Sequence, residues 1–162
     1  MLLLKQGKIE AGGKYDEKDL YIAPTVISGI TPENRIMNEE IFGPILPVMT
    51  FNEWETVIDY INSQEKPLAL YYFGKNKKNI REILEKTSSG GVCINDVVTH
   101  LANPDLPFGG VGHSGIGRYH GIDSFYTFSH TKSVLSTTTH INPGIKFAPY
   151  AGKLSILKRF MK

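Results

Sequence analysis

An α/β fold with a parallel sheet is the architecture that the sequence predicts. Between residues 45 and 94, short apolar runs alternate with amphipathic stretches in the order strand, helix, strand, helix, strand. This order predicts right-handed crossovers, because parallel neighbours must be joined by a connection that returns over one face of the sheet. The 162 residues, of which 41% are hydrophobic, suffice for one domain with a buried core.

The first predicted elements surround a proline and a helix cap. Residues 21–27 are rich in strand formers but contain Pro24, so they predict an edge strand or an irregular one. Residues 45–51 form the next predicted strand, and Asn52 with Glu55 three residues later has the pattern of a capping box. The helix that follows has one apolar stripe at helical spacing, formed by Trp54, Val57, Ile58 and Ile61.

Two further strands and a second helix complete the alternation. Residues 68–73 are almost continuously apolar, which is typical of a strand covered on both faces. Asn76 can cap the next helix, and Gly90-Gly91 predicts a left-handed end to it. Residues 92–94 then predict another buried strand.

Glycine and proline dominate residues 103–121, which predicts a long loop. Residues 110–115 match the letters of the G-x-G-x-x-G dinucleotide fingerprint. That fingerprint requires a strand directly before it and an acid about 20 residues later. Neither accompanies residues 110–115, so we interpret them as a tight loop that lets another segment approach closely.

The last part of the chain holds one more predicted strand and a basic end. Residues 132–139 are β-branched or small and predict a single strand that needs a partner edge. Residues 153–162 carry four basic side chains together with Leu154, Leu157 and Met161, so docking on a membrane surface is one hypothesis. Because this segment is short, membrane contact is not expected, and a solvated terminus is the expectation.

Composition excludes several function classes. A formal net charge of +2 argues against a nucleic-acid binder, which would carry a concentrated basic excess. The single cysteine cannot form an intramolecular disulfide, which fits a reducing compartment. No stretch approaches the ~18 apolar residues of a membrane span, and residues 1–5 are too short an apolar run for a secretory signal. A cytoplasmic location is therefore expected.

Residue chemistry alone offers few candidate sites. Cys93 lies within an apolar strand, where a thiolate is disfavoured, so we expect a small core residue rather than a nucleophile. The histidines lack metal-binding spacing, and no metal is expected. Glu39 and Glu40 precede a Gly-Pro turn, where a carboxylate can accept hydrogen bonds from the vicinal hydroxyls of a ribose. A solvated acidic turn is the alternative, and chemistry alone favours it.

Several short motifs follow one another in a familiar order and spacing. They are Glu-Ile-Phe-Gly-Pro at 40–44, Lys-Pro-Leu-Ala-Leu-Tyr at 66–71, Ser-Ser-Gly-Gly-Val at 88–92, Asn-Asp at 95–96 and Pro-Phe-Gly-Gly-Val-Gly at 107–112. Together they closely resemble the C-terminal part of aldehyde dehydrogenases. Tyr-His-Gly at 119–121 and Thr-Phe-Ser-His at 127–130 are similar to the class 3 branch of that family. The resemblance covers residues 8–133 and, more loosely, continues to residue 160.

The resemblance implies roles for individual residues. In the family, the glutamate and phenylalanine that match Glu40 and Phe42 bind the nicotinamide ribose and pack beside the nicotinamide, so NAD or NADP is the implied cofactor. The residues matching Asn95, His100 and Phe108 lie near the substrate tunnel, where His100 would give the aldehyde route a polar lining.

The resemblance also implies how the chain is divided. Residues 1–128 would be a partial catalytic domain containing a parallel βαβαβ sheet, and residues 129–140 an oligomerisation strand that makes a homodimer or larger oligomer. Residues 141–162 would be a C-terminal tail.

The resemblance further implies what the chain lacks. The family's nucleophilic cysteine, general-base glutamate, oxyanion asparagine and Rossmann domain all precede the part that matches. In the family, a thiolate attacks the aldehyde, hydride passes to NAD(P)+, and water hydrolyses the thioester. We therefore expect a C-terminal fragment of an enzyme that oxidises aldehydes to carboxylic acids, inactive alone and without catalytic residues of its own. The alternative is a non-catalytic α/β module for dimerisation or interaction.

Overall fold

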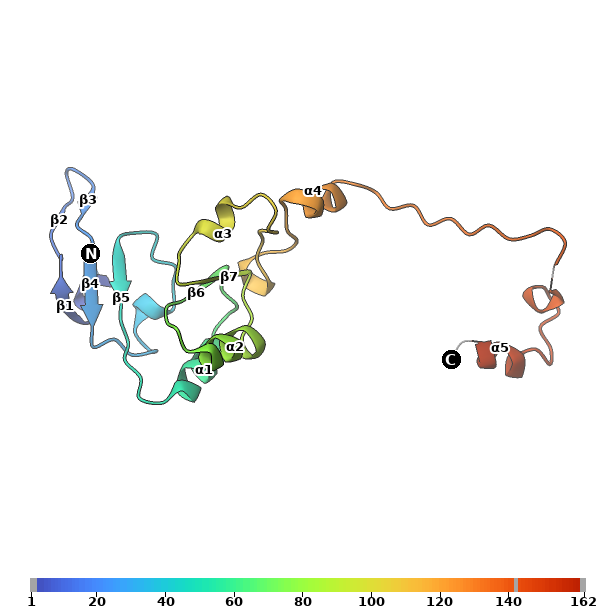
Figure 1. Ribbon diagram of the computed structural model, residues 1–162, viewed down its shortest axis with the longest axis horizontal. Coiled ribbons are helices and arrows are strands. Elements are labelled where there is room, and N and C mark those ends of the chain that lie inside the picture. Colours follow the sequence, from blue (N-terminus) through green and yellow to red (C-terminus); the bar gives the residue numbers. More distant parts are fainter. Residues whose placement is uncertain (1–2, 142, 161–162) are drawn as a thin grey trace. The chain divides into compact units, whose positions relative to one another are not determined.

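The computed structural model describes residues 3–141 and 143–160 of the chain (Figure 1). Two compact units are present, of which the first ends at Thr127 and the second begins at Phe128. Among the described residues, the first element of unit 1 is a short 3-10 helix, η1 (Leu3–Lys5), and the strands β1 to β7 all lie in this unit. It also contains the helices α1 to α4, whereas the second unit contains one 3-10 turn and the helix α5.

A three-stranded sheet forms the first half of unit 1, with β4 (Thr25–Ser28) at its centre. β1 (Lys8–Ala11) pairs with β4 antiparallel, and β5 (Ile45–Pro47) pairs with it parallel. Of the two alternatives predicted for residues 21–27, an edge strand or an irregular one, the irregular strand is confirmed, because β4 is central in its sheet. The chain forms β3 (Tyr21–Ile22), which pairs with β2 (Tyr15–Asp16), and breaks at Pro24 before β4. Pro24 thus precedes the central strand and removes no hydrogen bond from it.

The core of unit 1 lies against β4. Ile27 is completely buried and packs with residues from three other segments. These are Leu4, Ile30 and Ile36, with Met37, Ile41, Ile45 and Met49 partly buried around them. Ile36 belongs to η2 (Arg35–Met37), a short 3-10 helix that directly precedes the segment containing Glu40 and Phe42. The core therefore anchors both ends of that segment.

A second, two-stranded sheet consists of β6 (Ala69–Tyr72) and β7 (Gly91–Ile94). The two strands are parallel, with Tyr71 opposite Cys93, and are joined by the helix α2 (Lys77–Lys86). The α/β class and this crossover are thus confirmed. The expectation that β5 joins the same βαβαβ sheet is not met, because β5 pairs with β4 instead. α1 (Trp54–Ser63) follows β5 and packs beside α2 (Figure 1).

The ends of the two long helices test the capping predictions. Asn76 caps α2 as expected, since its Oδ1 accepts hydrogen bonds from the backbone N–H groups of Lys78 at 2.9 Å and Asn79 at 3.3 Å. The capping box at Asn52 is wrong, because α1 begins one residue later and its N-cap, Glu53, makes no side-chain cap. The left-handed end at Gly90-Gly91 is also wrong. Extended Thr87 ends α2, and its hydroxyl donates to the Ile83 carbonyl at 2.5 Å.

The glycine-rich segment 103–121 is a loop, as predicted, with a short 3-10 turn η3 (Gly112–Ser114). The Oγ of Ser114 accepts a hydrogen bond from the Val111 N–H at 2.9 Å, which closes residues 110–115 on themselves. Within the loop, an antiparallel bridge between Phe108 and Tyr119 closes the part between these two residues. It passes close to β7, because a Cβ on Gly90 would collide with the carbonyl oxygens of Leu68 and Gly109. The expected close approach of another segment is therefore found at Gly90.

Unit 2 begins with an extended segment and ends in α5 (Leu154–Phe160). Residues 130–138 belong to no helix or strand in the described chain, so the strand predicted at 132–139 is not formed here. The ammonium of Lys153 donates to the carbonyls of Gly144 at 2.7 Å and Phe147 at 2.8 Å, around η4 (Gly144–Lys146). Met161 and Lys162, part of the membrane-docking hypothesis, lie outside the described residues. No described helix has the length and apolar character needed to cross a membrane.

Candidate functional site

Glu40 lines a cavity of about 750 Å³ in unit 1. The cavity is bounded by three parts of the chain, namely residues 37–40, the end of α1 with residues 64–68, and residues 113–114. Of the other acids around it, Glu39 accepts from Arg35 Nε at 3.0 Å, and Glu65 lies 3.4 Å from His113 Nδ1. Glu40 has no ion pair within residues 3–141 and 143–160. Its carboxylate is thus available to accept hydrogen bonds from a bound molecule.

Tyr60 also lines the same cavity. Burial raises the pKa of the Tyr60 hydroxyl, and the nearby charge of Glu33 raises it further. The hydroxyl therefore keeps its proton at neutral pH and can donate a hydrogen bond. No sequence motif identified Tyr60, which appears on α1 only as one half-buried position on the helix.

Phe42 has an unusual backbone and an unusual exposure. Its φ is +42°, in the left-handed region that costs a residue with a Cβ about 1–2 kcal/mol. Its side chain is 89% exposed, so no packing of the ring offsets that cost. Two residues later the chain is fixed to β4, because the carbonyl of Pro44 accepts from the Thr25 N–H at 2.8 Å. An exposed aromatic ring in a strained backbone is a common feature of binding sites.

Asn95 lies where the strands β6 and β7 end. Its backbone N–H donates to the Tyr72 carbonyl at 2.7 Å, which extends the parallel ladder by one residue. Its side chain then forms two hydrogen bonds with the backbone of Gly74. The φ of Asn95 is +58°, a conformation that asparagine tolerates better than most residues. The structure thus gives Asn95 partners in the fold, and these do not include His100 or Phe108.

His100 and Phe108, in contrast, lie together. His100 belongs to the short helix α3 (Thr99–Ala102), and its ring centroid is 5.9 Å from that of Phe108. Tyr71 of β6 lies 6.0 Å from His100 on one side, and Tyr119 lies 5.9 Å from Phe108 on the other. His120, 6.2 Å from Phe108, completes the group. We call these five residues the aromatic wall.

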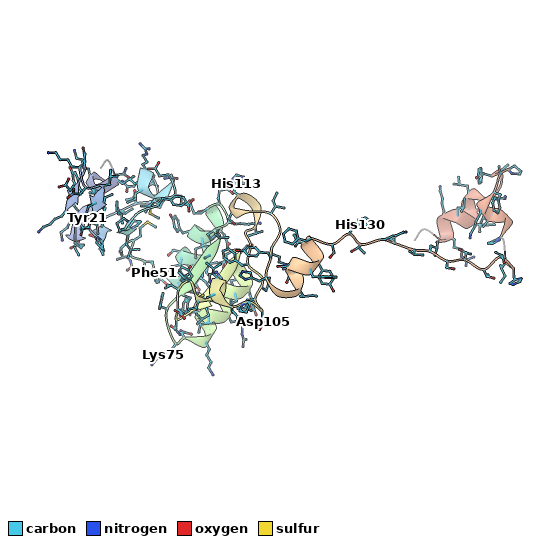
Figure 2. The ribbon with its side chains drawn as sticks, turned by 90° about the horizontal axis from the view of Figure 1, so that it is seen from above. Tyr21, Phe51, Lys75, Asp105, His113 and His130 are labelled. Atoms are coloured by element: carbon cyan, nitrogen blue, oxygen red, sulfur yellow. The ribbon has the colours of Figure 1, made fainter. Side chains whose placement is uncertain are left out.

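Sequence reasoning found two members of the aromatic wall and missed Tyr71, Tyr119 and His120. Tyr71 belongs to one of the motifs, but the sequence of a strand does not predict which rings its side chains contact. Tyr119 reaches Phe108 through the isolated bridge, in which each backbone N–H donates to the other carbonyl at 2.9 Å. That pairing closes the glycine-rich loop, and its positions are eleven residues apart. Figure 2 shows the loop between Asp105 and His113 within unit 1.

No group of three or more potential metal-ligating side chains occurs in the part of the chain that the structure describes. The chemistry of the two predicted sets of site residues suits organic ligands. Glu40 and Phe42 combine an anionic acceptor with an exposed ring, which suits a ribose joined to a flat heterocycle. His100 and Phe108 present aromatic surface, which suits an organic substrate.

The model of the aldehyde dehydrogenase family matches residues 3–134. The chain belongs to the aldehyde dehydrogenase family. Among its relatives, the 4,4'-diaponeurosporen-aldehyde dehydrogenase of Staphylococcus aureus is 46% identical over 157 residues, which is 97% of this chain and 34% of the relative. The dimeric NADP-preferring aldehyde dehydrogenase of Rattus norvegicus is 50% identical over 82% of this chain and 29% of the relative. Matches also include family 3 member A2 enzymes, which agrees with the class 3 resemblance.

Solved aldehyde dehydrogenase structures support the same assignment. The substrate-bound state of Staphylococcus aureus AldH has a TM-score of 0.80 and 45% identity, covering 99% of this chain and 36% of that one. An NAD-dependent aldehyde dehydrogenase from Sinorhizobium meliloti has a TM-score of 0.76 and 33% identity, covering 84% of this chain and 27% of that one. The chain therefore spans about a third of the length of the first aldehyde dehydrogenases that it matches.

Proposed function

We propose that this chain forms the C-terminal part of a class 3-like enzyme that oxidises aldehydes to carboxylic acids with NAD or NADP. The observation that carries the proposal is the free carboxylate of Glu40 on a cavity, two residues from the exposed, strained Phe42. A relative from rat is named NADP-preferring, and an aldehyde dehydrogenase from Sinorhizobium meliloti is named NAD-dependent. These names support a nicotinamide cofactor without choosing between its two forms.

In this proposal Glu40 and Phe42 bind the nicotinamide end of the cofactor. The Glu40 carboxylate accepts hydrogen bonds from both ribose hydroxyls, and Phe42 gives its exposed ring to the nicotinamide. The bound cofactor supplies a hydride acceptor. The chain's own contribution is to orient it, because the core holds η2 before Glu40 and β5 after Phe42.

Asn95, His100 and Phe108 belong to the aldehyde tunnel in this proposal, with different tasks. His100 and Phe108 line it as part of the aromatic wall. Asn95 acts behind them, because its bonds to Gly74 fix the end of β6, which carries Tyr71, to the end of β7, which leads to α3 and His100. None of these residues supplies a nucleophile, so the chain alone is predicted to be inactive in aldehyde oxidation.

Titration calorimetry with NAD+ and with NADP+ tests the cofactor half of the proposal. Wild-type chain is compared with Glu40→Gln, which removes the charge, and with Glu39→Gln, which changes the neighbouring acid already paired with Arg35. Loss of a charge-assisted hydrogen bond predicts affinity lower by about tenfold or more for Glu40→Gln alone. Equal affinities for all three chains, or no binding by wild type, would contradict a preformed ribose site.

A second candidate function is non-catalytic association, and the segment 130–138 favours it. This segment is extended, and it carries Val134 and Leu135, which are 79% and 92% exposed. An extended stretch with apolar side chains can add a strand to the sheet edge of another copy. Homodimerisation through 129–140 is thus a proposal, and sedimentation of wild type against Leu135→Lys tests it. A monomeric wild type would overturn it. A cytoplasmic location remains a prediction.

A further inference from the structure

Cys93 has a polar partner inside the fold. The residue lies in β7 and is only 7% exposed, and its Sγ is 3.1 Å from Nδ1 of His100. The next polar atom, Thr99 Oγ1, is 3.9 Å from the sulfur. That hydroxyl donates its own proton to Asp96 Oδ2 at 2.9 Å. Cys93 and His100 therefore form the shorter contact, and Thr99 has no proton left to donate to the sulfur.

The other ring nitrogen of His100 is in a different environment. Nε2 is buried and has no hydrogen-bond partner among the described residues. Gly91 makes room for this edge of the ring, because a Cβ there would lie 2.6 Å from Cδ2 and 2.9 Å from Nε2. The aromatic rings next to His100 include those of Tyr71 and Phe108, whose centroids lie 6.0 and 5.9 Å from the centroid of the His100 ring.

The two neutral tautomers of His100 are not equivalent in this environment. With the proton on Nδ1, the ring donates to sulfur, and Nε2 becomes a buried lone pair without a donor. With the proton on Nε2, the thiol donates to Nδ1, and the neighbouring Tyr71 and Phe108 rings offer aromatic faces, which are weak acceptors, to the Nε2–H. A buried lone pair finds no donor there, whereas a buried N–H can use an aromatic face as a weak acceptor, so the second arrangement is favoured.

We propose that Cys93 is a positioning residue, whose thiol donates to Nδ1 of His100 and holds the ring in one orientation with the proton on Nε2. No proton is transferred and no bond is made or broken. Both nitrogens of His100 are then turned into the fold. If the proposed tunnel is correct, on which this last step rests, a substrate meets the face of the His100 ring and not a free nitrogen.

This arrangement revises two sequence-based interpretations. Cys93 is buried as expected, but it is a hydrogen-bonding residue and not only a small core residue. His100 was expected to give the tunnel a polar lining, whereas here its polar atoms are directed at Cys93 and Gly91. The pairing needs a small residue at position 91, a thiol or hydroxyl at position 93 and an imidazole at position 100.

Nitrogen-15 NMR of the histidine rings in the full chain tests the proposal. In wild type, His100 is expected to show two well-separated ring signals, with Nε2 in the protonated position and Nδ1 in the unprotonated one. Exposed His140 serves as the internal reference for a ring that exchanges between tautomers. Averaged His100 signals in wild type, or a proton on Nδ1, would overturn the proposal without any variant.

Two substitutions then separate positioning from simple packing. In Cys93→Ala, which has no donor, the separation of the His100 signals should collapse toward that of His140. In Cys93→Ser, which keeps a donor, most of the separation should remain. An unchanged pattern in Cys93→Ala would overturn the proposal, as would a collapse in both variants. NAD+ binding should be the same in all three chains, so failure here is distinguishable from failure of the cofactor proposal.

Discussion

The side chain of Asn95 holds both backbone polar groups of Gly74. Its Oδ1 accepts from the Gly74 N–H at 2.7 Å, and its Nδ2 donates to the Gly74 carbonyl at 3.0 Å. Gly74 follows β6 and Asn95 follows β7, so one side chain joins the ends of two parallel strands. The amide is suited to this task because it offers one acceptor and one donor side by side.

Replacing Asn95 by alanine should destabilise the chain by about 2 kcal/mol, because two hydrogen bonds are lost and alanine is strained at a φ of +58°. Asn95→Gly also removes the hydrogen bonds, but glycine adopts this positive φ without strain. Its destabilisation should therefore be about 1 kcal/mol smaller than that of Asn95→Ala. Urea unfolding measures both values. If Asn95→Ala unfolded at the same urea concentration as wild type, the assigned structural role would be wrong.

The contact of Gly90 with the glycine-rich loop makes a second prediction. A methyl group at position 90 would overlap the carbonyl oxygens of Leu68 and Gly109, which are backbone atoms and cannot rotate away. Gly90→Ala should therefore lower the free energy of unfolding by about 2 kcal/mol. Gly144→Ala is the control, because a Cβ there meets nothing within 4 Å. Equal losses of stability in Gly90→Ala and Gly144→Ala would contradict the close approach of the Leu68 and Gly109 carbonyls to Gly90.

The ion pair of Glu82 should contribute to stability only while the Glu82 carboxyl is ionised. A hydrogen bond from Lys86 at 3.1 Å holds the pKa of this carboxyl below its ordinary value of 4.5. Since the folded-state pKa is the lower one, the contribution is complete above pH 4.5 and disappears as the pH falls through the folded value. Wild type should melt about 1 °C above Glu82→Gln at pH 6, and this difference should be smaller at pH 3.

Glu85→Gln on the same helix provides the matched control for that measurement. Glu85 is exposed and forms no ion pair with a described residue, so its replacement should leave the melting temperature unchanged at both pH values. A wild-type advantage over Glu82→Gln that is as large at pH 3 as at pH 6 would show that the interaction is not ionic.

Phe42 is predicted to serve binding and not stability. Phe42→Gly relieves a strained φ and exposes no core, so the free energy of unfolding should change by less than about 1 kcal/mol. NAD+ affinity should fall by roughly tenfold, because a stacked ring is lost. Leu20→Gly is the control, since Leu20 also has a positive φ, +51°, and is 91% exposed. A loss of stability as large as that of a core phenylalanine would contradict the assignment.

Local signals predicted the local parts of the fold. The Asn76 cap and the crossover from β6 to β7 depend on residues close together in sequence, and both were predicted. The partner of β5 was not, because the same short apolar run can pair with either sheet. Pro24 indicated irregularity correctly, but its position just before Thr25 decided that β4 could be a central strand.

Site residues that belong to a recognisable motif were predicted from the sequence. Those whose role depends on a contact between distant residues were missed. Glu40 was identified by resemblance, and the structure adds its cavity and its lack of an ion pair with any described residue. The bond between Cys93 and His100 joins a strand to a short helix through a turn that contains two positive φ angles, at Asn95 and Val98. Such a turn cannot be read from spacing, because left-handed valine is rare.

Chemical modification of Lys153 would change how unit 2 is held together. Its ammonium binds the carbonyls of Gly144 and Phe147 and so holds the turn η4 to the start of α5. Acetylation would remove the charge and two of the three protons that make such bonds possible, whereas methylation would keep the charge. Acetylation of this one lysine would therefore loosen the C-terminal unit, and monomethylation would leave it closed.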